Sequence, residues 1–410
     1  MTQPALNLEP ALETRPRPAD PGVESWIAFR AAKRIPELDG LRGVAIGLVI
    51  INHYFSDALA FRLAHPLAIL QVPTRLTWSG VDLFFVLSGF LIGGILLDAK
   101  DSSNYFKVFY VRRTFRILPI YLVLVGLAFL GAHFLPSAKY PLTRPYLVNL
   151  LPWYAYLTFT QNIWSLIWNV KTGVILGVTW SLAVEEQFYL TLPSVIRFLR
   201  RSLLPYVFCA GILCAFLLRV ALLLRFPRSL SAPQYLLPCR MDSLLMGALA
   251  AYMLRKQQVW CWLVARRKWL WRIFGVLFLG LAYFLAHSLP TSVPTASIGY
   301  DWLAFFYLMA LVLAVTDNRS FLGRALRWRW LMGLGTIAYC VYLIHLPVYF
   351  ATFGLILHKA DPRLATFADL AVSLLALALT IGIAKISWRF FEKPLVRFGH
   401  SLHYKNENEF

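Results

Sequence analysis

The sequence has 410 residues, of which 59% are hydrophobic and 15% are charged, and its formal net charge is +20. A soluble domain carries roughly 25% charged residues, and a water-soluble fold of this length has too little interior for so much apolar surface. The basic residues stand in short blocks between apolar segments, as they do in membrane proteins. Composition therefore excludes an ordinary soluble enzyme, argues against a nucleic-acid partner and predicts a protein embedded in the lipid bilayer.

Proline and charged residues dominate the start of the chain, with Pro4, Pro10, Pro16, Pro18 and Pro21. Such a segment has too few apolar side chains to fold alone, so residues 1–33 are expected to form a disordered cytoplasmic tail. Residues 398–410 are polar and predict a short cytoplasmic tail at the other end. Residues 34–397 between them are expected to form one transmembrane domain.

The central domain contains about ten apolar stretches, each near the 20 residues that a transmembrane helix needs. Lipid offers the backbone no hydrogen-bond partners, so each stretch is expected to be helical. The predicted spans are 41–58, 80–98, 117–135, 180–198, 203–224, 236–254, 273–289, 300–316, 335–357 and 366–388. The predicted fold class is therefore all-α, a polytopic integral membrane helical bundle.

The topology follows from the basic residues. Most of the 40 Lys and Arg residues fall on one side of the membrane if both termini are cytoplasmic, and this asymmetry favours that orientation. The stretch 146–168 is apolar and rich in Trp and Tyr. If it crossed the bilayer, every later basic loop would move outside, so we predict a re-entrant or interfacial segment on the outer side.

Ionisable groups inside a membrane span are costly and mark functional sites. In the first predicted helix, Arg42 and His53 are 11 residues apart. This spacing puts them on nearly the same helix face and about 16 Å apart along the axis. The pair predicts a cation near the cytosol and an imidazole nearer the outer side. The alternative is an arginine that snorkels to the interface and a histidine that only joins helices.

Three carboxylates are expected at the depth of His53. Asp82 begins the second predicted helix, and Glu185 and Glu186 lie one turn into the fourth, after Trp180 and Ser181, which are further cavity candidates. A buried histidine needs a partner that fixes its tautomer, and we expect one of the three carboxylates to serve. For Asp82 the alternative is a carboxylate placed at a helix N-terminus by the helix dipole.

Two further groups extend this pattern. Arg113 and Arg116 share a helix face at the cytoplasmic end of the third helix, where they suit phosphate binding or serve only as topological anchors. In the ninth helix, Tyr342 and His345 are three residues apart and either line the same cavity or join helices. The residues thus predict a cationic pole facing the cytosol and a His/carboxylate pole facing outward.

These segments resemble the acyltransferase-3 family of membrane O-acyltransferases. The resemblance covers about residues 35–397 and is carried by LDGLRG followed by His53, GVDLFFVLSGFLI, RRTFRILP, TWSLAVEEQFYL, GTIAYCVYLIHLPV and FEKPL. It implies transfer of an acyl group, usually acetyl, from acetyl-CoA to a hydroxyl of an extracytoplasmic glycan or lipid-linked sugar. His53 would be catalytic, and Arg42, Arg113 and Arg116 would lie near the CoA phosphates.

The mechanism expected on this basis uses His53 as general base, polarised by Glu185, Glu186 or Asp82, with Tyr342 as an oxyanion donor. A covalent acyl-His53 relay is a variant. Acyl-CoA is the donor substrate, the carbohydrate is the acceptor, and no permanently bound cofactor or metal is expected. The alternative function is a transporter or flippase of a sugar or acyl intermediate with a His/Glu proton relay.

Overall fold

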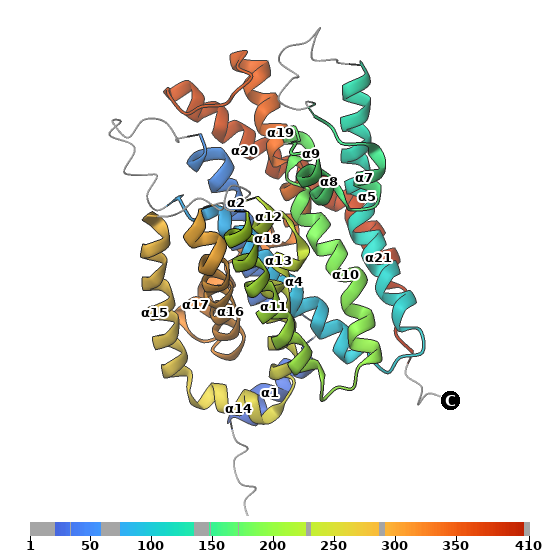
Figure 1. Ribbon diagram of the computed structural model, residues 1–410, viewed down its shortest axis with the longest axis vertical. Helices are drawn as coiled ribbons and strands as arrows, with labels where there is room; N and C mark the ends of the chain where they lie inside the picture. The colour runs from blue at the N-terminus through green and yellow to red at the C-terminus, as the bar shows by residue number, and fades with distance from the viewer. Residues whose placement is uncertain are drawn as a thin grey trace, which may run out of the picture.

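The computed structural model describes residues 21–32, 34–58, 74–134, 147, 149–170, 172–226, 231–286 and 292–405. Within these ranges the secondary structure is helical and contains no strand, which confirms the all-α prediction. Long helices run between two ends of the molecule, and shorter helices cover the ends (Figure 1). The structure is that of a helical membrane bundle.

The long helices correspond one by one to the predicted spans. They are α2 (Pro36–Ile51), α4 (Gly80–Asp98), α5 (Tyr105–Phe134), α10 (Trp180–Phe198), α11 (Leu204–Arg225), α13 (Leu237–Leu254), α15 (Arg267–Ala286), α16 (Tyr300–Thr316), α19 (Ala338–Leu357) and α20 (Phe367–Ser387). Seven helical runs in the described part of the chain are long and apolar enough to cross a bilayer. The helices outside that set are α2, α10 and α13, which carry many of the polar groups discussed below.

Helices α4 and α13 pack with their backbones in close contact. A Cβ atom on Gly89 would lie 1.8 Å from the carbonyl oxygen of Leu244, and one on Gly247 would lie 2.1 Å from that of Val86. Glycine at these two positions therefore permits the approach, as small residues do between membrane helices. This contact sets the distance between the helices that carry Asp82 and Arg240.

Gly89→Ala is expected to destabilise the protein, because the added methyl group must separate α4 from α13. Overpacking of this kind costs about 1–3 kcal/mol, occasionally more. Gly126→Ala in α5 is the matched control, since nothing lies within 4 Å of a Cβ there and alanine improves helix propensity by about 1 kcal/mol. Thermal unfolding in detergent should give a lower Tm for Gly89→Ala only; equal Tm values would contradict the close contact.

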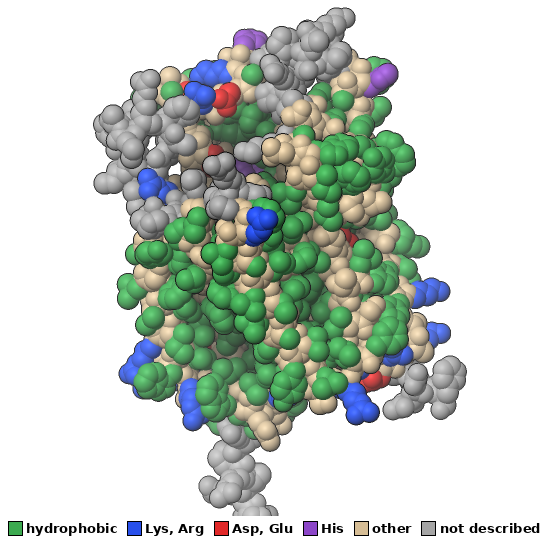
Figure 2. Space-filling model, viewed as in Figure 1, with side chains coloured by type: hydrophobic (Ala, Val, Ile, Leu, Met, Phe, Trp, Pro, Cys, Tyr) green, Lys and Arg blue, Asp and Glu red, His purple; other side chains and the backbone are tan. Residues whose placement is uncertain are grey.

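Both ends of the described chain lie at the same end of the bundle. Arg30 of α1 (Pro21–Ala31) donates to Asp98 at 2.8 Å, and the Lys405 amide donates to Asn104 at 3.0 Å. Asp98 and Asn104 flank the α4–α5 connection. Most of the visible Lys and Arg side chains gather at the lower end of the molecule, below a hydrophobic belt (Figure 2). This distribution supports the prediction that this end faces the cytosol.

The N-terminal tail is more ordered than predicted. Residues Pro21–Ala31, which the sequence predicts to be part of a disordered tail, form helix α1. The ring of Phe29 stacks on that of Trp260 at 4.6 Å, and the Trp260 indole donates to Ser25 at 2.9 Å. Trp260 belongs to α14 (Gln257–Ala265), so contact with another element supplies the apolar burial that the segment lacks alone. Residues 1–20 and 33 lie outside the described residues.

The stretch 146–168 forms short helices in its described part. These are α7 (Trp153–Leu157) and α8 (Gln161–Ile167), followed by α9 (Val174–Gly177). Neither α7 nor α8 is long enough to cross a bilayer, which agrees with the predicted re-entrant or interfacial segment. The tyrosine hydroxyl of Tyr121 in α5 donates to the Tyr156 carbonyl at 2.9 Å, so the segment is fixed against the bundle.

Candidate active site

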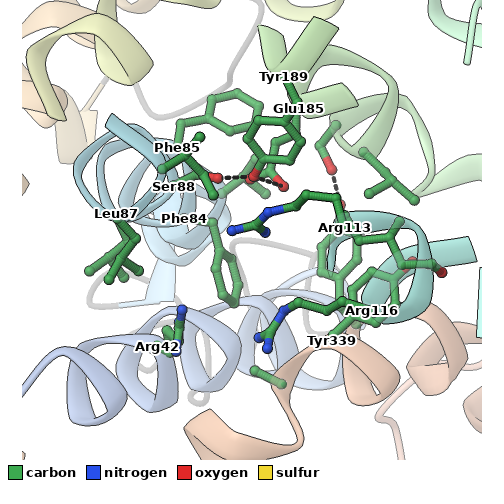
Figure 3. A pocket seen from close by; sticks show the side chains of 18 of the residues that line it. Arg42, Phe84, Phe85, Leu87, Ser88, Arg113, Arg116, Glu185, Tyr189 and Tyr339 are labelled. Atoms are coloured by element: carbon green, nitrogen blue, oxygen red, sulfur yellow. Dashed lines mark hydrogen bonds between the residues drawn. The ribbon is translucent and has the colours of Figure 1, made fainter. Parts of the chain in front are cut away.

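A cavity of about 120 Å³ lies inside the bundle between α2, α4, α5, α10 and α19. Its polar lining consists of Arg42, Ser88, Arg113, Arg116, Ser181, Glu185, Tyr189, Tyr339 and Tyr342. Phe84, Phe85 and several aliphatic side chains form the rest of the wall, and Figure 3 shows the central part of this lining. Six of the residues predicted from sequence as site residues therefore line one cavity: Arg42, Arg113, Arg116, Ser181, Glu185 and Tyr342.

The three predicted arginines converge on this cavity. Arg42 from α2 and Arg113 and Arg116 from α5 direct their guanidinium groups into the same space (Figure 3). Arg42 is paired with Asp39, with 3.1 Å between nitrogen and oxygen. Arg113 and Arg116 form no ion pair with any residue that the structure describes, and the Arg113 guanidinium lies 5.2 Å from the centre of the Tyr189 ring. Cations in such surroundings favour an anionic ligand.

Arg112 is adjacent in sequence but does not line the cavity. Its guanidinium donates to the Leu402 carbonyl at 2.6 Å and 3.1 Å, and it lies 5.1 Å from the centre of the Tyr404 ring. The helical rotation of about 100° per residue accounts for this difference, because it places Arg113 and Arg116 on one face and Arg112 on another. The Arg-x-x-Arg spacing thus selects the residues that reach the cavity.

Glu185 also faces the arginine cavity. The Tyr189 hydroxyl donates to its carboxylate at 3.3 Å and accepts a hydrogen bond from the Ser88 hydroxyl. The sequence predicts Glu185 as one of three candidate partners of His53, but no hydrogen bond between described residues joins the two side chains. Helical rotation turns Glu185 toward hydroxyl donors on α4 and α10, which satisfy a buried carboxylate. Glu186 lines no part of the cavity, and its Oε1 is buried without a hydrogen-bond partner among the described residues.

Asp82 pairs with an arginine and not with His53. Its carboxylate accepts from Arg240 of α13, and both side chains are 1% exposed. The expectation that Asp82 polarises His53 is therefore not met. Hydrogen bonds from a cation to a carboxylate are stronger than neutral ones, and Arg240 supplies that cation across the close α4–α13 contact.

This ion pair belongs to a buried network that the sequence analysis missed. Arg219 of α11 donates to Asp242 of α13 at 2.6 Å and to Asp301 of α16. The Arg240 guanidinium lies 3.7 Å from the centre of the Tyr300 ring. The signal was present, because Arg219, Arg240 and Asp242 fall inside predicted spans, where ionisable residues are significant by default. Their pairing joins α4, α11, α13 and α16.

His53 lies in the π-helical turn η1 (Asn52–Ser56) that ends α2. Its Nδ1 is 3.1 Å from the Val49 carbonyl oxygen and 3.2 Å from Nε2 of His345. The two imidazole centres are 5.0 Å apart. A π turn widens a helix by one residue and is frequent at functional sites. The structure thus brings together two histidines that are far apart in sequence.

The histidine pair is next to one end of the cavity. Tyr342 lines the cavity, and its ring centre is 5.9 Å from that of His345. The Tyr342 hydroxyl is 2.5 Å from that of Ser181 and donates to the Val178 carbonyl at 2.9 Å. Trp180, predicted beside Ser181, instead packs edge-on against Tyr235 and lies outside the lining. The cavity therefore has arginines on one side and Tyr342, followed by the histidines, on another.

Fold and cavity together define a multi-pass helical membrane protein with a buried, basic cavity. The family model of the acyltransferase domain (Acyl_transf_3) matches residues 35–388. The chain therefore belongs to the acyltransferase-3 family, which confirms the resemblance carried by its motifs.

Curated relatives share this domain at low identity. Peptidoglycan O-acetyltransferase OatA of Listeria monocytogenes is 27% identical over 91% of this chain and 57% of its own length. O-acetyltransferase OatA of Staphylococcus aureus is 25% identical over 89% of this chain and 58% of its own length. The chain thus spans less than two thirds of the relatives that it matches. No solved structure matches it.

Proposed function

We propose that this protein transfers an acyl group, acetyl, from cytosolic acyl-CoA to a hydroxyl of an extracytoplasmic or lipid-linked carbohydrate. The observation that carries the proposal is the single cavity with Arg42, Arg113 and Arg116 on one side and Tyr342, beside His345 and His53, on another. Two relatives are named O-acetyltransferases, one of them for peptidoglycan. Peptidoglycan is accordingly the first acceptor to examine, in a bacterial cytoplasmic (inner) membrane.

The volume of the cavity favours a thin donor arm. A site for a drug-sized ligand occupies about 300–1,000 Å³, whereas this cavity holds about 120 Å³. The acyl-pantetheine chain of CoA enters it, and the nucleotide stays at the basic end of the bundle. Guanidinium groups bind phosphates through paired hydrogen bonds, which is the role proposed for the three arginines. Acyl-CoA is thus a donor substrate and not a resident cofactor.

In the proposed reaction, His53 takes the proton of the acceptor hydroxyl. The oxygen forms a bond to the thioester carbonyl carbon, the carbon–sulfur bond breaks, and the CoA thiolate receives the proton from His53. The hydroxyls of Ser181 and Tyr342 are 2.5 Å apart, and Tyr342 donates to the Val178 carbonyl. On donor binding these hydroxyls turn their hydrogens from these partners to the developing oxyanion. Glu185 lies with the arginines and balances their charge when the donor is absent.

The proposal is tested by comparing strains that lack the gene with complemented strains. Mass spectrometry of peptidoglycan fragments, surface polysaccharide and lipid-linked glycan should show an acetyl mass difference in one of these fractions. The difference should return on complementation. Identical acylation of all three fractions in both strains would contradict the proposal.

Removing two arginines from the cavity should weaken donor binding. Hydrogen bonds to charged groups contribute about 1.5–3 kcal/mol each, so Arg113→Ala with Arg116→Ala should lower acyl-CoA affinity by at least about tenfold. Arg112→Ala is the matched control, because its guanidinium contacts Leu402 and not the cavity. Calorimetry with acetyl-CoA on detergent-purified protein measures both. Unchanged affinity in the double variant would show that Arg113 and Arg116 do not bind the donor and serve only as topological anchors.

A further inference from the structure

We infer that His345 is a positioning residue that holds His53 in the tautomer whose Nε2 is free to accept a proton. The inference rests on the proposed role of His53 as general base. Each imidazole is in contact with main-chain carbonyl oxygens, and a carbonyl oxygen only accepts hydrogen bonds. These contacts determine where the protons of the pair reside.

The tautomer of His345 follows from its own helix. Its Nδ1 is 2.7 Å from the Tyr342 carbonyl oxygen and 3.2 Å from that of Val341. Because neither oxygen can donate, Nδ1 must carry a hydrogen. The Nε2 atom of His345 is then the one that faces His53.

The same argument applies to His53. Its Nδ1 is 3.1 Å from the Val49 carbonyl oxygen, so this nitrogen also carries a hydrogen. It lies 3.2 Å from Nε2 of His345, and two hydrogens cannot occupy that contact. His345 Nε2 therefore accepts and His53 Nδ1 donates, which leaves the lone pair of neutral His53 on Nε2. No described residue forms a hydrogen bond with that Nε2 atom.

The surrounding contacts hold the pair in place. His345 is fully buried, and its carbonyl accepts from the Tyr54 hydroxyl at 2.7 Å. Tyr54 follows His53 directly, and its own carbonyl accepts from the Tyr349 hydroxyl at 3.2 Å. The turn that carries His53 and the helix that carries His345 are thus joined by two hydrogen bonds through Tyr54 in addition to the histidine contact.

An imidazole here takes the place that a carboxylate occupies in many catalytic histidine sites. Asp57, the acid nearest to His53 in sequence, instead accepts from the Asn52 amide at 3.0 Å. A neutral acceptor adds no charge to a site within the membrane, where charge is costly. When Nε2 of His53 takes the substrate proton, the ring becomes cationic, and its Nδ1–H bond to His345 strengthens.

Two substitutions of His345 separate positioning from packing. The side-chain carbonyl of His345→Gln reaches the place of Nε2 and can accept from His53, whereas the amide of His345→Asn reaches only the place of Nδ1. Loss of an orienting partner lowers activity about 10–100-fold. We expect His345→Asn to show that loss in kcat with an unchanged KM for acetyl-CoA, and His345→Gln to retain activity within about threefold of wild type, well short of that range.

Nitrogen-15 NMR of histidine-labelled protein in detergent reads the tautomer directly, with His53→Ala used to assign the signals. The expected wild-type result is a protonated Nδ1 and an unprotonated Nε2 on His53. The population of this tautomer should fall in His345→Asn, where only the Val49 carbonyl still accepts from Nδ1. A proton on Nε2 of neutral His53, or equal activity of the Gln and Asn variants, would overturn the inference. Full activity of His53→Ala would instead refute the proposed catalytic role, and the NMR result would still decide the tautomer.

Discussion

His53→Ala is expected to lower acyl transfer by about 10²–10⁴-fold, the usual contribution of a general base, and to leave acetyl-CoA binding unchanged. The reason is geometric: the residue lies next to His345 and outside the lining of the arginine cavity. His53→Gln should lose activity similarly, because an amide does not accept a proton at neutral pH.

Transfer of radiolabelled acetyl groups to acceptor in isolated membranes measures this effect. The matched control is His133→Ala, a histidine in the last turn of α5 with no place in the cavity. Equal amounts of each variant must be inserted, as shown by quantitative immunoblotting. Activity of His53→Ala within a few-fold of wild type would remove His53 from the mechanism.

Arg240→Met is expected to destabilise the protein strongly. It leaves Asp82, 1% exposed, without its cation, and breaking a buried pair from one side costs about 3–5 kcal/mol. The unpaired carboxylate destabilises the α4–α13 contact, where the two helices also pack closely through glycine. A large fall in Tm is therefore expected without any direct change in the arginine cavity.

The double variant Asp82→Leu with Arg240→Met provides the control, because a buried ion pair is often replaced by apolar residues at little cost. It should recover most of the stability that Arg240→Met loses, as measured by thermal unfolding in the same detergent. A single variant as stable as wild type, or a double variant that is no better than the single one, would contradict the account of this pair.

Much of the fold could be predicted because it depends on local composition. The apolar stretches that became α5, α11 and α15 each fall within the length range of a bilayer span and have few other solutions in lipid. The approach of Arg113 to Arg116 was equally predictable, because it follows from the period of one helix. The helical order of α1 could not be predicted, because its apolar side chains are buried against Trp260, which is far away in sequence.

The partners of the buried charges could not be predicted. Asp82 and Arg240 are 158 positions apart, and His53 and His345 are 292 apart. Which side chains meet depends on how each helix is rotated about its own axis, and contacts such as Gly89 against Leu244 set that rotation. Counting residues along each helix gives depth but not facing direction. The sequence therefore leaves Glu185 among three candidate partners of His53, although it faces the arginines.

Transfer across the bilayer tests the central claim most directly. Proteoliposomes are prepared with soluble peptidoglycan fragments inside and radiolabelled acetyl-CoA outside, and the vesicles whose basic end faces outward are selected by a tag on α1. The account predicts label on the enclosed fragments, and none with Arg113→Ala plus Arg116→Ala at the same low donor concentration. Label that appears only when donor and acceptor share one compartment would contradict a route through the bundle.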